Sequence, residues 1–157
     1  MKKWIICLTF IALVILAFAY NFLAKNQEIN PKNENMPKTL KIGQITLNVE
    51  IADTEAERVQ GLSGREKLGE SEGLLFVFDR EGYYSFWMKD MKFPIDMAWL
   101  DKNKRIIYIE KNVSPETYPK IFYAMKDNIP IPSLYVLETN ANFFENSKIK
   151  IGDFAEF

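Results

Sequence analysis

Two acidic residues, Asp96 and Glu138, stand out because each interrupts a largely apolar segment of the chain. A carboxylate that faces a protein interior costs free energy unless it is paired or hydrogen-bonded, and its pKa is shifted. Two such groups that converge on one cleft can act as general acid and general base, as they do in glycoside hydrolysis. The alternative is that each acid points outward or has a structural role, so we assign no catalytic residue from this pattern.

Arg65 is a candidate for binding an anionic group, because it follows the short glycine-rich turn Gly61-Leu62-Ser63-Gly64. A guanidinium at such a turn can hold a carboxylate or a phosphate through two parallel hydrogen bonds. The competing interpretation is a structural ion pair between Arg65 and Asp96 or Glu138, which a partly buried arginine often forms.

An aromatic segment, Phe86-Trp87-Met88-Lys89-Asp90, supplies the other candidate binding residues. If this segment is a strand and Trp87 faces outward, its ring offers a flat platform for a sugar or another apolar ring, whereas core packing is the alternative. Lys89 lies where the strand would end, a common place for binding groups. The predicted binding site therefore comprises Arg65, Trp87, Lys89, Asp96 and Glu138.

The residue types that are missing exclude several chemistries. The chain has no histidine, and its single cysteine is Cys7. Ser–His or Cys–His catalysis, zinc or iron–sulfur sites held by these residues and an intrachain disulfide are therefore impossible, and we expect neither a metal site nor a cofactor. From residue 40 onward, 15 lysines and arginines stand against 19 aspartates and glutamates. This acidic balance does not favour nucleic-acid binding.

The N-terminal sequence predicts attachment to a membrane. Two lysines precede an apolar run over residues 4–24, which at about 1.5 Å per residue is long enough to cross a hydrocarbon core of about 30 Å. We expect a transmembrane anchor or signal peptide over residues 1–24, with the remainder of this single-pass protein outside the cytoplasm. The alternative is cleavage near Ala19, which would yield a secreted or periplasmic protein.

The elements that must position the candidate residues are mostly short strands. Residues 25–39 are polar and predict a flexible tether, which leaves 40–157 as one domain. Thr54 followed by Glu57 predicts a capping box at the start of a short helix over residues 55–60. Apolar runs and alternation predict strands over residues 40–42, 45–51, 74–78, 84–88, 96–100, 105–110, 134–139 and 149–154.

Many short strands with one or two small helices indicate a mainly β fold, either a β-sandwich or a partly closed barrel. The stretch 111–132 contains four prolines and is long for a connection without secondary structure. Loops of this length often cover a functional site.

Five segments, taken in order and spacing, carry a resemblance to a known family. They are Glu57-Arg58-x-x-Gly61-Leu62-x-x-Arg65, Gly73-Leu74-Leu75-Phe76-Val77-Phe78, Phe86-Trp87-Met88-Lys89-Asp90 with Pro94-Ile95-Asp96, Tyr135-Val136-Leu137-Glu138, and Ile151-Gly152-Asp153. Over nearly all of residues 40–157 the chain resembles the domain of unknown function 192 family. The resemblance implies a compact jelly-roll-like β fold and an exported or membrane-anchored protein, and it implies no particular activity.

The chain departs from the family pattern at three positions. Ser63 stands where methionine is usual, Met91 where threonine is common, and Asn142 where glycine often follows alanine. Asparagine tolerates a positive φ better than most residues, so the turn at Asn142 can still form.

We therefore expect a binding or accessory module of the cell envelope, attached to the membrane through residues 4–24. Its ligand would be a glycan, an anionic small molecule or an envelope protein. One alternative is a metal-independent enzyme that uses paired carboxylates, for example on glycans, and needs both groups at one cavity, about 5 to 10 Å apart. The other is a structural assembly partner that contacts an envelope protein through a sheet edge or residues 111–132.

Overall fold

The computed structural model describes residues 38–157, so the expectations for the N-terminal anchor and for most of the tether lie outside the described part of the chain. In this part, no helix is both long enough and apolar enough to cross a membrane. The elements are β1 (Thr39–Ile42), β2 (Ile45–Ala52), α2 (Glu55–Gln60), β3 (Glu72–Gly82), β4 (Ile95–Leu100), β5 (Ile106–Val113), a 3-10 turn (Pro115–Thr117), β6 (Met125–Lys126), β7 (Ile129–Pro130), β8 (Ser133–Asn140), α3 (Phe143–Asn146) and β9 (Ala155–Glu156).

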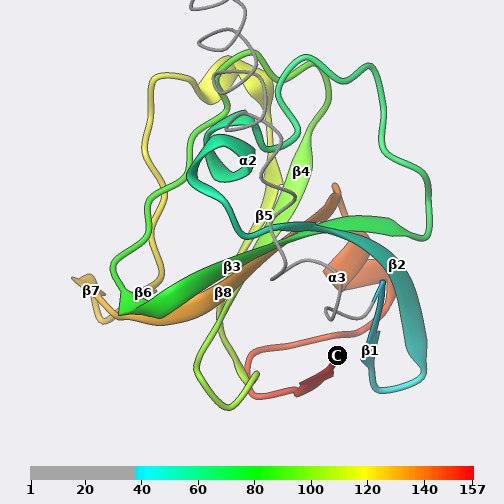
Figure 1. The fold of residues 1–157 in the computed structure, drawn as a ribbon, viewed down its shortest axis with the longest axis vertical. Coiled ribbons are helices and arrows are strands. Elements are labelled where there is room, and N and C mark those ends of the chain that lie inside the picture. Colours follow the sequence, from blue (N-terminus) through cyan, green and yellow to red (C-terminus); the bar gives the residue numbers. More distant parts are fainter. Residues whose placement is uncertain (1–37) are drawn as a thin grey trace, which may run out of the picture. The chain divides into compact units, whose positions relative to one another are not determined.

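The fold is mainly β, as predicted, and is built on one curled sheet of seven strands (Figure 1). The strand order is β5-β4-β8-β3-β2-β1-β9, and β6 and β7 form a separate hairpin. Strands β2 and β3 are parallel because the chain between them carries α2 and returns to the same end of the sheet. Because all the long strands belong to one sheet, the fold is a half-barrel, which agrees with the partly closed barrel of the prediction and differs from its alternative, a jelly-roll-like sandwich of two sheets.

The two edges of the curled sheet approach each other near the C-terminus. Strand β9 pairs with β1 on one side. On the other side, the amide of Ala155 donates a hydrogen bond to the carbonyl of Lys104 at 2.9 Å, and the amide of Ile106 donates to the carbonyl of Asp153 at 2.9 Å. These bonds join the C-terminal segment to the start of β5 and partly close the barrel at this end.

The predicted helix forms with its capping box. The Thr54 hydroxyl accepts a hydrogen bond from the Glu57 amide at 3.2 Å, and the Glu57 carboxylate accepts one from the Thr54 amide at 3.0 Å. The chain leaves α2 at Gly61, whose φ of 49° is a conformation that glycine adopts more readily than other residues. This turn directs the chain toward Arg65 and over the outer face of the sheet.

The sheet buries a hydrophobic core on each of its faces, because successive side chains of a strand point to opposite sides. The inner core lies within the curl and joins residues of both edges, such as Leu40 and Ile106, to Phe144 of α3. The outer core lies on the other face of β3, β4 and β8. Loops cover this outer face with the buried side chains Leu62, Leu68, Met88, Phe122 and Ala124.

Two predicted strands are replaced by irregular chain. Residues 84–88 cross the outer face of the sheet as a covering segment and make a single antiparallel bridge, between Phe86 and Phe122. Tyr84 and Phe86 pack on aromatic side chains of the sheet, whereas Trp87 between Phe86 and Met88 is exposed. The segment therefore alternates like a strand although it pairs with no neighbouring strand beyond this bridge. Residues 149–154 contain a turn at Ile151 and Gly152, with Gly152 at a φ of 100°, and a single bridge between Phe154 and Arg105, and the strand begins only at Ala155.

Four short elements were not predicted at their positions, namely α3, the 3-10 turn, β6 and β7. Helix α3 follows Asn142, which adopts a φ of 66°. This agrees with the expectation that asparagine can take the positive φ of the glycine common at this position. The stretch 111–132 contains the end of β5, the 3-10 turn, and the β6–β7 hairpin. The loop therefore has more local structure than its proline content predicted.

Candidate functional site

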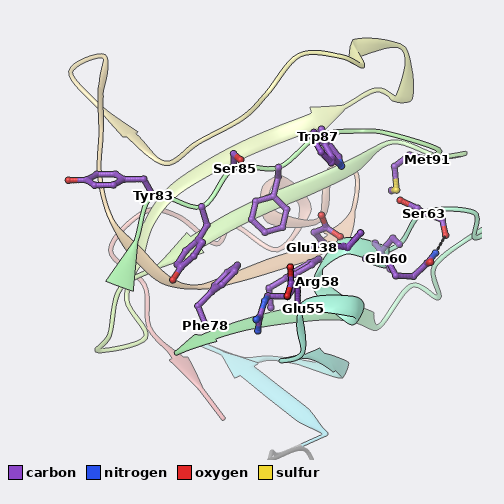
Figure 2. A pocket seen from close by; sticks show the side chains of 16 residues that line it. Glu55, Arg58, Gln60, Ser63, Phe78, Tyr83, Ser85, Trp87, Met91 and Glu138 are labelled. Atoms are coloured by element: carbon purple, nitrogen blue, oxygen red, sulfur yellow. Dashed lines mark hydrogen bonds between the residues drawn. The ribbon is translucent and has the colours of Figure 1, made fainter. Parts of the chain in front are cut away.

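A cavity of about 350 Å³ lies on the outer face of the sheet, between α2 and residues 83–87. Figure 2 shows Glu138 of β8 between α2, which carries Arg58, and the segment that carries Trp87. We call this space the aromatic cavity because six aromatic rings line it. They are Phe76, Phe78, Tyr83, Tyr84, Phe86 and Trp87.

The walls of the aromatic cavity are fixed by contacts between their own rings. Phe78 and Tyr84 stack with ring centroids 3.4 Å apart and an angle of 8° between their planes. Phe76 and Phe86 meet edge to face at 4.8 Å. Such contacts hold aromatic side chains in defined positions, so the cavity has its shape before any ligand enters.

Glu138 is the buried polar group at the base of the aromatic cavity. Its side chain is flanked across the sheet by Leu74 of β3 and Met97 of β4, which are its partners in register. The residue is only 5% exposed, and its Oε2 atom has no hydrogen-bond partner among residues 38–157. Burial raises the pKa of Glu138 to about 8, although the positive charge of Arg65 opposes this change. At neutral pH the carboxyl group therefore holds a proton.

Arg65 does not form the ion pair expected from the sequence. Its guanidinium binds Glu50 of β2 through two hydrogen bonds, of 2.5 and 2.7 Å, instead of Asp96 or Glu138. Glu50 is in register with Leu74, and Leu74 with Glu138, so these three side chains share one face of the sheet. The hydrogen bond from Arg65 lowers the pKa of Glu50. Arg65 thus lies beside the aromatic cavity, on an adjacent hollow, with its charge partly neutralised.

Asp96 is completely buried and holds loop backbone on the inner side of the sheet. One carboxylate oxygen accepts hydrogen bonds from the amides of Asn112 and Asn142 at 2.7 and 3.0 Å, and the other accepts from the amide of Phe144 at 3.2 Å. These bonds tie the end of β5 and the start of α3 to β4.

Asp96 and Glu138 lie on opposite faces of the sheet. Asp96 is in register with Thr139, whereas Glu138 is in register with Met97. Directly opposed residues share a face and successive residues alternate, so the two carboxyl groups point away from each other. The paired-carboxylate hypothesis requires both groups at one cavity, and the structure places them on opposite sides of the sheet.

Trp87 and Lys89 lie at the rim of the site. Trp87 is 52% exposed and lines both the aromatic cavity and a neighbouring hollow, whereas Lys89 lines only the hollow. The Ser63 hydroxyl donates a hydrogen bond to the Lys89 carbonyl at 2.9 Å, which ties the glycine-rich turn to the rim. Of the five predicted residues, Glu138 and Trp87 therefore share the cavity, Arg65 and Lys89 border it, and Asp96 lies elsewhere.

Sequence reasoning missed Arg58 and the two tyrosines of the cavity. The Arg58 guanidinium donates hydrogen bonds to the carbonyls of Asp53 and Val77, at 2.5 and 2.9 Å, and lies 5.2 Å from the centroid of the Phe78 ring. The sequence feature that could have indicated Arg58 is its position next to Glu57 in the first of the five segments that carry the family resemblance. Tyr83 and Tyr84 lie before the aromatic segment, separated from it by Ser85, and Tyr84 was predicted only as the start of a strand. In the described range 38–157, no three acidic side chains are grouped to hold a metal ion.

The comparisons with known proteins agree with this fold. The DUF192 family model, described as an uncharacterised ACR, matches residues 38–157. A crystal structure of a Novosphingobium aromaticivorans protein of unknown function is 28% identical with a TM-score of 0.69, and the match covers 76% of this chain and 84% of that one. A Sinorhizobium meliloti structure, provisionally described as a transcription regulator, is also 28% identical with a TM-score of 0.69, over 75% and 91% of the two chains. No curated protein matches.

Proposed function

We propose that this chain, which belongs to the DUF192 family, is a binding module that takes a small molecule in the aromatic cavity. The observation that carries the proposal is the Glu138 carboxyl group, which is buried at an open cavity while its Oε2 atom lacks a hydrogen-bond partner in the described chain. An unsatisfied buried polar group costs about 1–3 kcal/mol. A ligand that completes the hydrogen bonding of Glu138 would recover this cost on binding.

The form of the cavity supports the same proposal. Its volume of about 350 Å³ falls within the range of small-molecule sites, which is about 300–1,000 Å³. Such sites are mostly apolar and contain a few polar groups that orient the ligand. Here the aromatic walls supply the apolar surface, Glu138 supplies the polar group, and the exposed ring of Trp87 offers a stacking surface at the entrance.

The other candidate functions have less support. The enzyme hypothesis keeps only one member of its predicted carboxylate pair at the cavity, since Asp96 faces the opposite side of the sheet. A regulator that binds nucleic acid is disfavoured by the excess of acidic over basic residues from residue 40 onward. We retain the cell envelope as the proposed location, with the domain outside the cytoplasm, because of the apolar run over residues 4–24.

A thermal-shift screen of the whole chain against envelope glycan fragments, amines, alcohols and organic acids tests the proposal. A ligand at a hundred times its Kd stabilises the folded state by about 2.7 kcal/mol, which raises Tm by several degrees in a domain of this size. We expect Glu138→Gln and Trp87→Ala to reduce the shift. The control is Glu145→Gln, which changes an exposed glutamate of α3 and should leave the shift intact.

Two results would count against binding at the aromatic cavity. One is the absence of any shift across the screen, which would favour a protein partner for the exposed rim. The other is a shift that persists unchanged in both Glu138→Gln and Trp87→Ala, which would locate the ligand elsewhere.

A further inference from the structure

The polar side chains that line the aromatic cavity differ in whether they already have hydrogen-bond partners within the protein. The Gln60 side-chain amide donates a hydrogen bond to the Ser63 carbonyl at 2.8 Å, and the Ser63 hydroxyl donates to the Lys89 carbonyl at 2.9 Å. Arg58 is held by two carbonyls and lies over Phe78. Glu138 alone combines deep burial at the cavity with an unpartnered oxygen in the described chain. The other polar residues of the lining, Glu55, Tyr83 and Ser85, are exposed, so Glu138 is the buried polar group that a ligand must satisfy.

The aromatic walls restrict the ligand further. The faces of tyrosine, tryptophan and phenylalanine rings carry negative electrostatic potential and attract cations. A sugar would bring several hydroxyl groups to walls that are mostly aromatic rings. An anion would meet ring faces and the acids Glu55 and Glu138, and the cation of the lining, Arg58, already donates to two backbone carbonyls. A cation with an apolar stem is complementary to both features, because its charge suits Glu138 and its stem suits the rings.

Building on the proposed function, we propose that the aromatic cavity binds a primary ammonium group carried on an apolar or aromatic stem, with the ammonium group donating to Glu138. The stem would lie along the stacked rings of Phe78 and Tyr84 and reach Trp87 at the rim. A primary ammonium provides up to three N–H donors and can therefore satisfy the free Oε2 atom of Glu138, which a quaternary ammonium cannot.

Binding of a cation in this position is coupled to the ionisation of Glu138. The carboxyl group is protonated at neutral pH because burial raises its pKa to about 8, and an ammonium group would stabilise the ionised form. The other charged or titratable groups at the site are Arg65 beside the cavity, Glu55 and Arg58 on α2, and the hydroxyl groups of Tyr83 and Tyr84. Binding of the ammonium group should therefore release a proton from Glu138, and replacing Glu138 with glutamine must abolish this release.

Three probes with a similar aromatic stem separate the possible ligand classes. They are 2-phenylethylamine as the cation, 2-phenylethanol as the neutral counterpart and phenylacetate as the anion. Alkylamines have a pKa near that of lysine, about 10.4, so the amine stays mostly charged up to pH 9. Calorimetry of the whole chain at pH 6, 7 and 9, in buffers of different ionisation enthalpy, reports both affinity and proton release.

We expect the amine to bind most tightly, to release most of one proton at pH 7, and to gain affinity from pH 6 to pH 9 by up to about two orders of magnitude. Glu138→Gln should remove the proton release and most of this pH dependence, whereas Glu145→Gln should change neither. The pH profile of the unmodified chain is a sufficient test by itself if Glu138→Gln does not fold.

Contrary results would separate this inference from the proposed function. If the alcohol or the acid binds more tightly than the amine, in a manner that depends on Glu138, the cavity is a binding site but the ammonium inference is wrong. The same holds if amine affinity falls as the pH rises. If none of the three probes binds, the ammonium inference fails, and the wider screen then decides whether the cavity binds another class of small molecule.

Discussion

Replacing Glu138 with glutamine removes the titration of a buried acid while it nearly preserves the size of the side chain. Burial raises the pKa of Glu138 from its ordinary value of 4.5 to about 8. Between these two values, the folded chain holds a proton that the unfolded chain has released. The free energy of unfolding of the unmodified chain must therefore fall as the pH rises through this window, and the contribution of Glu138 is constant below and above it.

The size of the effect follows from the width of the window. At about 1.4 kcal/mol for each pH unit, the interval from 4.5 to about 8 corresponds to roughly 5 kcal/mol. This is comparable to the whole stability of a weakly stable domain, which is about 5–15 kcal/mol. The carboxyl groups of Glu50 and Glu57 titrate outside the window. The hydrogen bond from Arg65 lowers the pKa of Glu50, and for Glu57 burial is outweighed by hydrogen bonds at Thr54 and Asp53.

Urea unfolding of the unmodified chain and of Glu138→Gln at pH 5, 6, 7, 8 and 9 measures the effect. We expect the stability of the unmodified chain to fall relative to the variant by roughly 4 kcal/mol between pH 5 and pH 8, and the difference to level off above pH 8. Comparing the two proteins cancels the titration of all other groups. Glu145→Gln, at an exposed glutamate, should follow the unmodified chain at every pH.

Parallel stability curves for the unmodified chain and Glu138→Gln would refute this reasoning. They would mean that Glu138 ionises in the folded protein as readily as in the unfolded one, and that its carboxyl group is hydrated. The ammonium inference would then lose its predicted proton release.

Three other substitutions test the roles of neighbouring residues by urea unfolding at pH 7. Asp96→Asn should lower the free energy of unfolding by about 2–4 kcal/mol, because an NH2 group replaces one of the two oxygens that accept hydrogen bonds from loop amides. An unchanged stability would contradict the structural role of Asp96. Arg65→Ala should cost less than about 1 kcal/mol through loss of its exposed pair with Glu50. Repeated over pH 5–9, the unfolding of this variant should show a pKa of Glu138 that is raised further, and a lowered pKa would contradict the electrostatic argument. Thr54→Ala should cost about 1 kcal/mol by removing the cap, whereas Thr54→Ser should restore most of it.

Much of the local structure could be predicted from the sequence because its causes are local. Alternation over residues 45–51 specifies a half-buried strand, and Thr54 with Glu57 specifies the start of α2. The apolar context of Asp96 and Glu138 singled out both acids but left open whether they face the interior, and the structure shows that both are buried. These features depend on residues a few positions apart, so a single sequence contains the necessary information.

Only the tertiary structure determined how these residues combine into a site. The register of β4 against β8 decides that Asp96 and Glu138 face opposite sides, because a shift of one residue reverses the direction of every side chain in a strand. Likewise, Arg65 binds Glu50 because the parallel pairing of β2 with β3 brings Glu50 onto the same face as Glu138. Strand register and crossover direction are set by packing between segments far apart in the chain. The sequence therefore singled out the two acids, and long-range packing decided that both are buried and that only Glu138 faces the cavity.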